Sequence, residues 1–128
     1  MYTVGANGGL TAIGGSPFAD NQTAPCWVAV SPDGSTLFAI NTGSSSISRY
    51  AVAGNGTLTL AGSTVMTTPT GLRPFDAAVS PDGAYLYVVD AGVAKISAFA
   101  VDGTNLTELA GSPMAIPGGA APFGMVVD

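Results

Sequence analysis

The six residues Ala-Val-Ser-Pro-Asp-Gly occur twice in this chain, at 29–34 and again at 78–83, 49 positions later. The similarity extends well beyond them, because residues 25–41 align with 74–90 without a gap. After a one-residue slip it continues to a shared Ala-Gly-Ser. Self-similarity at a period of about 48 residues indicates that the chain builds one supersecondary unit repeatedly.

Each copy contains four short apolar segments, with turn signals about every 8 to 12 residues, which is the spacing of antiparallel strands. In Ser-Pro-Asp-Gly, proline presets the backbone for the second turn position and glycine accepts the left-handed one, so this motif joins the first two strands. A repeated four-stranded unit of this length predicts the blade of a β-propeller. A short linear solenoid is the alternative.

The predicted fold class is therefore all-β, a partial β-propeller with two complete four-stranded blades and two partial ones. The blades are assigned to residues 1–17 (the end of a blade), 25–66, 74–114 and 122–128 (the start of a blade). Strands are expected at about 2–5 and 10–13, four within 26–66, four within 75–114, and one at 123–128.

Blades bury their faces against neighbouring blades. We therefore expect the chain to be a fragment, whose partners are the remaining blades of a parent chain. Self-association is the alternative, for example three chains approximating an eight-bladed ring.

The composition excludes several kinds of partner and site. Only three residues are basic (Arg49, Arg73 and Lys95) and the net charge is −5, which argues against nucleic acid. No apolar run approaches the roughly 18 residues that a membrane helix needs, so no membrane insertion is expected. Cys26 is the single cysteine and histidine is absent, and no cofactor motif occurs. We expect no metal and no cofactor.

Two segments resemble the lactonase-type seven-bladed propellers, the 6-phosphogluconolactonase-like family. They are PCWVAVSPDGSTLFAIN at 25–41, and SSISRYAVAGNGTLT at 45–59 with the Gly-Ser-Pro that recurs elsewhere in the chain. The resemblance covers essentially the whole chain. It implies a ligand face around a central channel, formed by the loops between blades and those between second and third strands.

The copies differ at candidate functional positions near the channel mouth. Trp27, Asp76 and Gly124 occupy one equivalent position, and Asn41 and Asp90 occupy another, where they are expected to bond nearby backbone amides. Trp27, Asp76, Asn41 and Asp90 are the binding candidates. Asp76, Arg73 and Asp90 are the catalytic candidates, because a carboxylate activates water and a guanidinium stabilises an oxyanion. Tolerant variation at a strand end is the alternative for the first of these positions. A solvated loop with an ordinary surface ion pair is the alternative for the catalytic candidates.

Two functions are carried forward. In the first, the parent is a 6-phosphogluconolactonase-like hydrolase of carbohydrate metabolism that opens a sugar lactone, while the fragment itself is inactive. In the second, the parent is a non-catalytic propeller that binds a ligand or a protein. A metabolic lactonase would be cytoplasmic, whereas a binding propeller would be periplasmic or at the cell surface.

Overall fold

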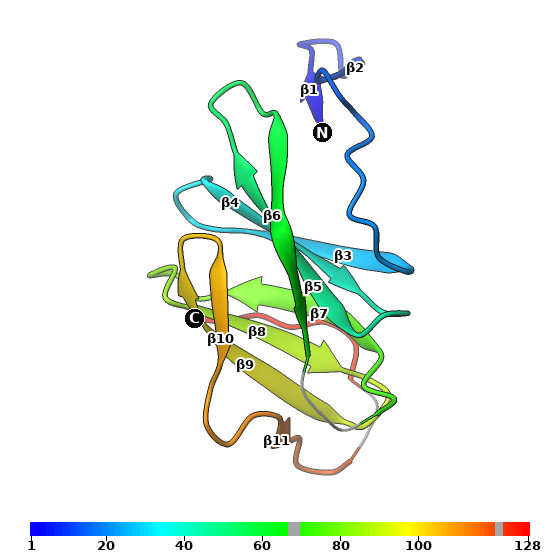
Figure 1. The fold of residues 1–128 in the computed structure, drawn as a ribbon, viewed down its shortest axis with the longest axis vertical. Coiled ribbons are helices and arrows are strands. Elements are labelled where there is room, and N and C mark those ends of the chain that lie inside the picture. Colours follow the sequence, from blue (N-terminus) through cyan, green and yellow to red (C-terminus); the bar gives the residue numbers. More distant parts are fainter. Residues whose placement is uncertain (67–69, 120–121) are drawn as a thin grey trace.

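The computed structural model describes residues 1–66, 70–119 and 122–128, and all regular structure in these residues is strand (Figure 1). The first half holds β1 (Tyr2–Val4), β2 (Leu10–Ala12), β3 (Pro25–Val30), β4 (Thr36–Asn41), β5 (Ser46–Val52) and β6 (Leu58–Val65). The second half holds β7 (Pro74–Val79), β8 (Tyr85–Asp90), β9 (Lys95–Asp102), β10 (Asn105–Glu108) and β11 (Met114–Ala115). The predicted all-β class is confirmed.

Each copy of the repeat forms one antiparallel sheet. The first sheet, which we call blade 1, has the strand order β3-β4-β5-β6. The second, blade 2, has the order β7-β8-β9-β10, and β11 also pairs with β9. The fourth strand of blade 2 is thus split into two pieces where β6 is continuous. Leu109, just after β10, still donates its backbone N–H to the carbonyl oxygen of Ala98 at 2.9 Å, and a turn closed by Ser112 N–H and Leu109 O then leads to β11.

The Ser-Pro-Asp-Gly turns are held by their own side chains. Asp33 Oδ1 accepts hydrogen bonds from Ser31 Oγ at 2.6 Å and Ser35 N at 3.0 Å. The second copy repeats this pattern at Asp82, which accepts from Ser80 Oγ at 2.6 Å. The hydrogen bond from Ser31 is the main cause that lowers the pKa of Asp33 to about 2. These carboxylates are engaged in turn structure.

The two blades pack face to face. We call the side of a blade that is turned toward the earlier part of the chain its leading face, and the opposite side its trailing face. The trailing face of blade 1 and the leading face of blade 2 share one apolar cluster of fully buried side chains, and β3 lies beside β7. The cluster is centred on Phe38, Ile40, Ile47, Leu86, Val88 and Phe99.

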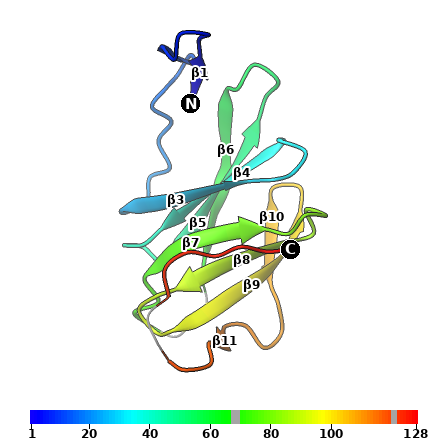
Figure 2. The ribbon, with the colours of Figure 1, turned by 180° about the vertical axis from the view of Figure 1, so that it is seen from behind.

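The two ends of the chain depart from the blades in different ways. The hairpin β1–β2 matches the predicted strands and lies apart from both sheets (Figure 1). The strand expected at 123–128 is wrong: this segment has no regular structure. It runs along blade 2 (Figure 2) and its side chains alternate as in a strand, with Met125 and Val127 half-buried and Val126 82% exposed. A strand is defined by a ladder of hydrogen bonds, and none of the described strands pairs with this segment.

The core between the blades should dominate stability. Phe38→Ala removes a fully buried ring from it, so we expect the free energy of unfolding to fall by about 3–5 kcal/mol. Val4→Ala is the matched control, because Val4 is 72% exposed on the β1–β2 hairpin, and it should change stability by about 0.5 kcal/mol or less. Urea unfolding followed by circular dichroism measures both. Equal losses would contradict the packing described.

Candidate functional site

The first strands of the two blades, β3 and β7, begin in the same irregular way, and we call them the inner strands. Both start at a proline, and a β-bulge follows at once, between Pro25 and Trp27 in β3 and between Pro74 and Asp76 in β7. A bulge opposes two residues to one on the partner strand and re-aims the side chains beside it. The residue pairs 26–27 and 75–76 therefore leave the regular alternation at the point where the inner strand begins.

These two pairs meet a third at one cavity. The cavity has a volume of about 350 Å³ and is lined by Cys26, Trp27, Phe75, Asp76, Phe123 and Gly124. They are the two residues after the proline in three successive copies of the repeat. We call it the inner-strand pocket. The position at which the copies differ most, with Trp27, Asp76 and Gly124, thus converges on a single site.

Asp76 is the polar group of this pocket. It is 7% exposed, and its Oδ1 accepts a hydrogen bond from the backbone N–H of Ala77 at 2.7 Å. Among the described residues, Oδ2 has no hydrogen-bond partner. It lies toward Gly124, where a Cβ would come to 3.9 Å from it. A buried carboxylate with one oxygen free calls for a hydrogen-bond donor or a cation from a ligand.

The remaining walls are aromatic. The rings of Phe75 and Phe123 meet edge to face, with centroids 5.4 Å apart and an interplanar angle of 63°. Trp27 is 48% exposed and Cys26 is a free, exposed thiol. Sequence reasoning missed Phe75, Phe123 and Cys26 as site residues. The signal was available, since each occupies the position directly after the proline in its copy.

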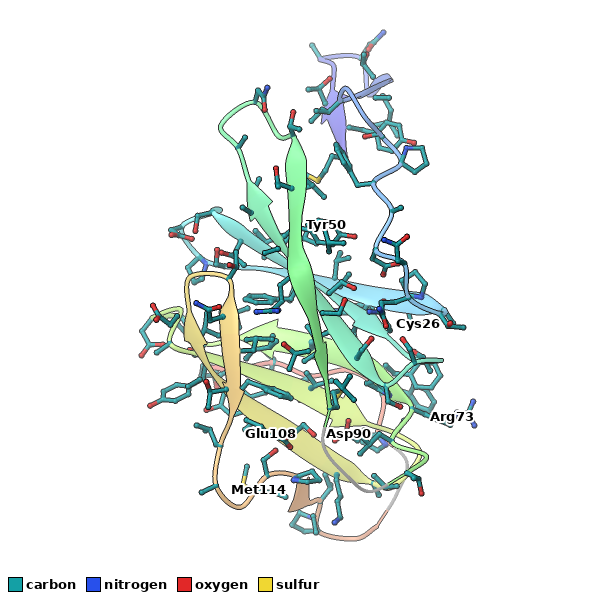
Figure 3. The ribbon with its side chains drawn as sticks, viewed as in Figure 1. Cys26, Tyr50, Arg73, Asp90, Glu108 and Met114 are labelled. Carbon is teal, nitrogen blue, oxygen red and sulfur yellow. The ribbon has the colours of Figure 1, made fainter. Side chains whose placement is uncertain are left out.

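Arg73 lies outside this pocket. Its guanidinium carbon is 5.8 Å from the centroid of the Phe75 ring, and it lines a second, smaller cavity of about 140 Å³. Phe75 and Phe123 line both cavities. Figure 3 shows Arg73 and Cys26 on the same edge of the molecule, with the Arg73 side chain extending outward. Arg73 and Asp76 therefore line different cavities, which share the two phenylalanines.

Asn41 and Asp90 are the last residues of β4 and β8, and both are fully buried. Asn41 Nδ2 donates to Ser46 Oγ at 3.1 Å and Ser48 Oγ at 2.9 Å, while Asp90 Oδ2 accepts from Ser97 Oγ at 2.7 Å. The expected bonds to backbone amides are thus replaced by bonds to serines of the neighbouring strand. The structure does not bring Asp90 together with Asp76 in the inner-strand pocket.

Burial is the main cause that raises the pKa of Asp90, to about 6. The hydrogen bond from Ser97 opposes the shift and nearby Glu108 adds to it. Asp90 Oδ1 is buried and has no hydrogen-bond partner among the described residues. The charged form of this carboxyl is therefore disfavoured in the folded chain. Its contribution to stability is present below pH 4 and is lost as the pH rises through about 6.

Asp90→Asn should therefore stabilise the chain in a pH-dependent way. Asn41 occupies the equivalent position in blade 1, so the amide fits the site. We expect the free energy of unfolding at pH 7.5 to rise by about 2 kcal/mol, with little change at pH 4. Denaturant unfolding at several pH values measures this. A variant with the same advantage at both pH values would contradict the assignment.

Within 1–66, 70–119 and 122–128 no three metal-ligating side chains come together. No helix in that part of the chain is long and apolar enough to cross a membrane.

Known proteins share this architecture. Among solved structures, a protein of Bacteroides uniformis provisionally named 6-phosphogluconolactonase is 20% identical, with a TM-score of 0.74 over 94% of this chain and 37% of that one. Its counterpart from Bacteroides fragilis is 26% identical, with a TM-score of 0.71 over 87% of this chain and 31% of that one. The periplasmic gluconolactonase of Pseudomonas aeruginosa is 23% identical, with a TM-score of 0.63 over 98% and 36%.

The chain spans about a third of the length of these proteins. At such identities the structural likeness shows the fold, a part of a propeller. No curated protein is significantly similar in sequence. The sequence profile of the family described as "Lactonase, 7-bladed beta-propeller" matches residues 1–126. The two blades and the pocket between their inner strands are thus part of a propeller, and the chain belongs to the seven-bladed lactonase family.

Proposed function

We propose that the propeller to which this chain contributes hydrolyses the lactone of a sugar acid, and that the inner-strand pocket is this chain's share of the site. One observation carries the proposal: a nine-tenths buried carboxylate, Asp76, keeps one oxygen free toward a pocket with aromatic walls. Family membership and the gluconolactonases of like fold support it.

The proposed chemistry uses Asp76 as general base. Its free Oδ2 takes a proton from water as the water oxygen adds to the lactone carbonyl carbon. The tetrahedral intermediate then collapses with cleavage of the ring C–O bond, and the ring oxygen leaves as a hydroxyl after receiving a proton. Aromatic rings pack against the C–H faces of the substrate and exclude bulk water.

The oxyanion needs a donor, and none of the described residues that line the pocket has a basic side chain. Arg73 is a candidate, but it lines the smaller cavity and not this pocket. We therefore propose that further blades complete the site and that the 128-residue chain alone is inactive. The same separation of Arg73 from Asp76 favours the second candidate function, a propeller that binds a ligand without turning it over.

The test compares four proteins by acid release from glucono-1,5-lactone in a pH-stat. The 128-residue chain should show no turnover above the spontaneous rate. A propeller completed by the further blades should show turnover, and Asp76→Asn within it should lower kcat by about 100-fold or more. Asp33→Asn, in a turn far from the pocket, is the control and should leave kcat unchanged.

Turnover by the isolated chain would contradict the division of the site between blades. A completed propeller that binds the lactone without hydrolysing it would favour the binding function. Full activity in Asp76→Asn would remove Asp76 from the mechanism.

A further inference from the structure

We propose that the ring held in the inner-strand pocket carries no phosphate group. This inference rests on the proposed function, because that function places a sugar ring in the pocket. It goes further by choosing between the two chemical forms of such a ring, the plain one and the phosphorylated one. The choice follows from the charge of the pocket and from the positions of the basic side chains.

Asp76 is the one charged residue among those that line the pocket. It is 7% exposed, so its interactions with a bound anion are weakly screened by solvent. Residues 67–69 and 120–121 carry no charged side chain, as their sequence shows. A phosphate next to Asp76 would bring like charges together in a partly dry site.

None of the three basic residues offsets this charge. Arg49 is used between the blades, where Nη1 donates to the carbonyl oxygen of Thr104 at 2.8 Å. Lys95 begins β9 two strands away from the start of β7, opposite Asp90 in register, and it does not line the pocket. Arg73 lies over the Phe75 ring and lines the smaller cavity, not this pocket. A phosphate site needs such donors converging on it.

An uncharged sugar ring supplies the hydrogen-bond donors and apolar faces that match the groups lining the pocket. Its hydroxyl groups donate hydrogen bonds, and Asp76 Oδ2 is an acceptor without a partner in the described residues. Its C–H faces are apolar and pack against rings such as Trp27, Phe75 and Phe123. The glycine at 124, whose φ is 88°, leaves open the space in front of the carboxylate.

The test uses a matched pair of stable ligands, D-glucose and D-glucose 6-phosphate. Trp27 is the only tryptophan and lines the pocket, so its fluorescence reports binding directly. We expect glucose to change the fluorescence of the 128-residue chain saturably, with a Kd at least tenfold lower than that of the phosphate. Asp76→Asn should bring the two Kd values together, because the like charge is gone.

Asp33→Asn is the matched control, since it removes the same unit of charge at an exposed turn remote from the pocket. It should leave the ratio of the Kd values for glucose and glucose 6-phosphate unchanged. A second measurement uses the wild-type chain alone: below pH 6 the phosphate loses one negative charge, so the ratio of the Kd values should narrow.

Three outcomes would overturn the inference. The first is that glucose 6-phosphate binds as tightly as glucose, and the second is that neither ligand alters Trp27 fluorescence. The third is that Asp33→Asn and Asp76→Asn change the ratio of the two Kd values equally. None of them removes the proposed hydrolysis, which is measured by turnover in the completed propeller. Loss of that turnover with retained discrimination would instead make the propeller a sugar-binding protein.

Discussion

The buried contact between the two blades determines where everything else in the chain lies. Phe38 and Ile40 on the trailing face of blade 1 share one core with Leu86, Val88 and Phe99 of blade 2. Apolar burial of this kind does not by itself fix the relative orientation of two blades. Their strands pair in the same register, so the apolar side chains of both blades stand at matching positions and fix that orientation. With the faces matched, β3 must lie beside β7, and the bulges that open the two strands lie side by side at one end.

The same packing explains how residues far apart in the sequence form one pocket. Residues 122–128 continue the repeat and lie on blade 2 as the start of a third copy, although they lack a partner strand. Phe123 then meets Phe75. In such a site the repeated fold places equivalent residues next to each other. The differences between the copies determine which side chains stand there. Trp27, Asp76 and Gly124 stand at equivalent positions of the three copies and line this one cavity.

The repeat was sufficient to predict the strand order and both sheets, because alignment of 25–41 with 74–90 requires the same turn and pairing in each copy. It placed Trp27, Asp76 and Gly124 at equivalent positions of the copies, and the structure shows that all three line one cavity. It could not predict that Arg73 stacks on Phe75, or that Asn41 and Asp90 turn inward to serines. Those outcomes depend on side-chain packing across blades, which periodicity does not encode.

The most direct test of this account is whether the three inner-strand starts lie together in solution. Cys26, the only cysteine, is exposed and accepts a nitroxide label without further mutation. The account predicts strong paramagnetic broadening of the amide signals of Asp76, Phe123 and Gly124, with those of β10 spared. Broadening confined to β3 and its sheet neighbours would show that the blades do not pack as described, and the pocket would not exist.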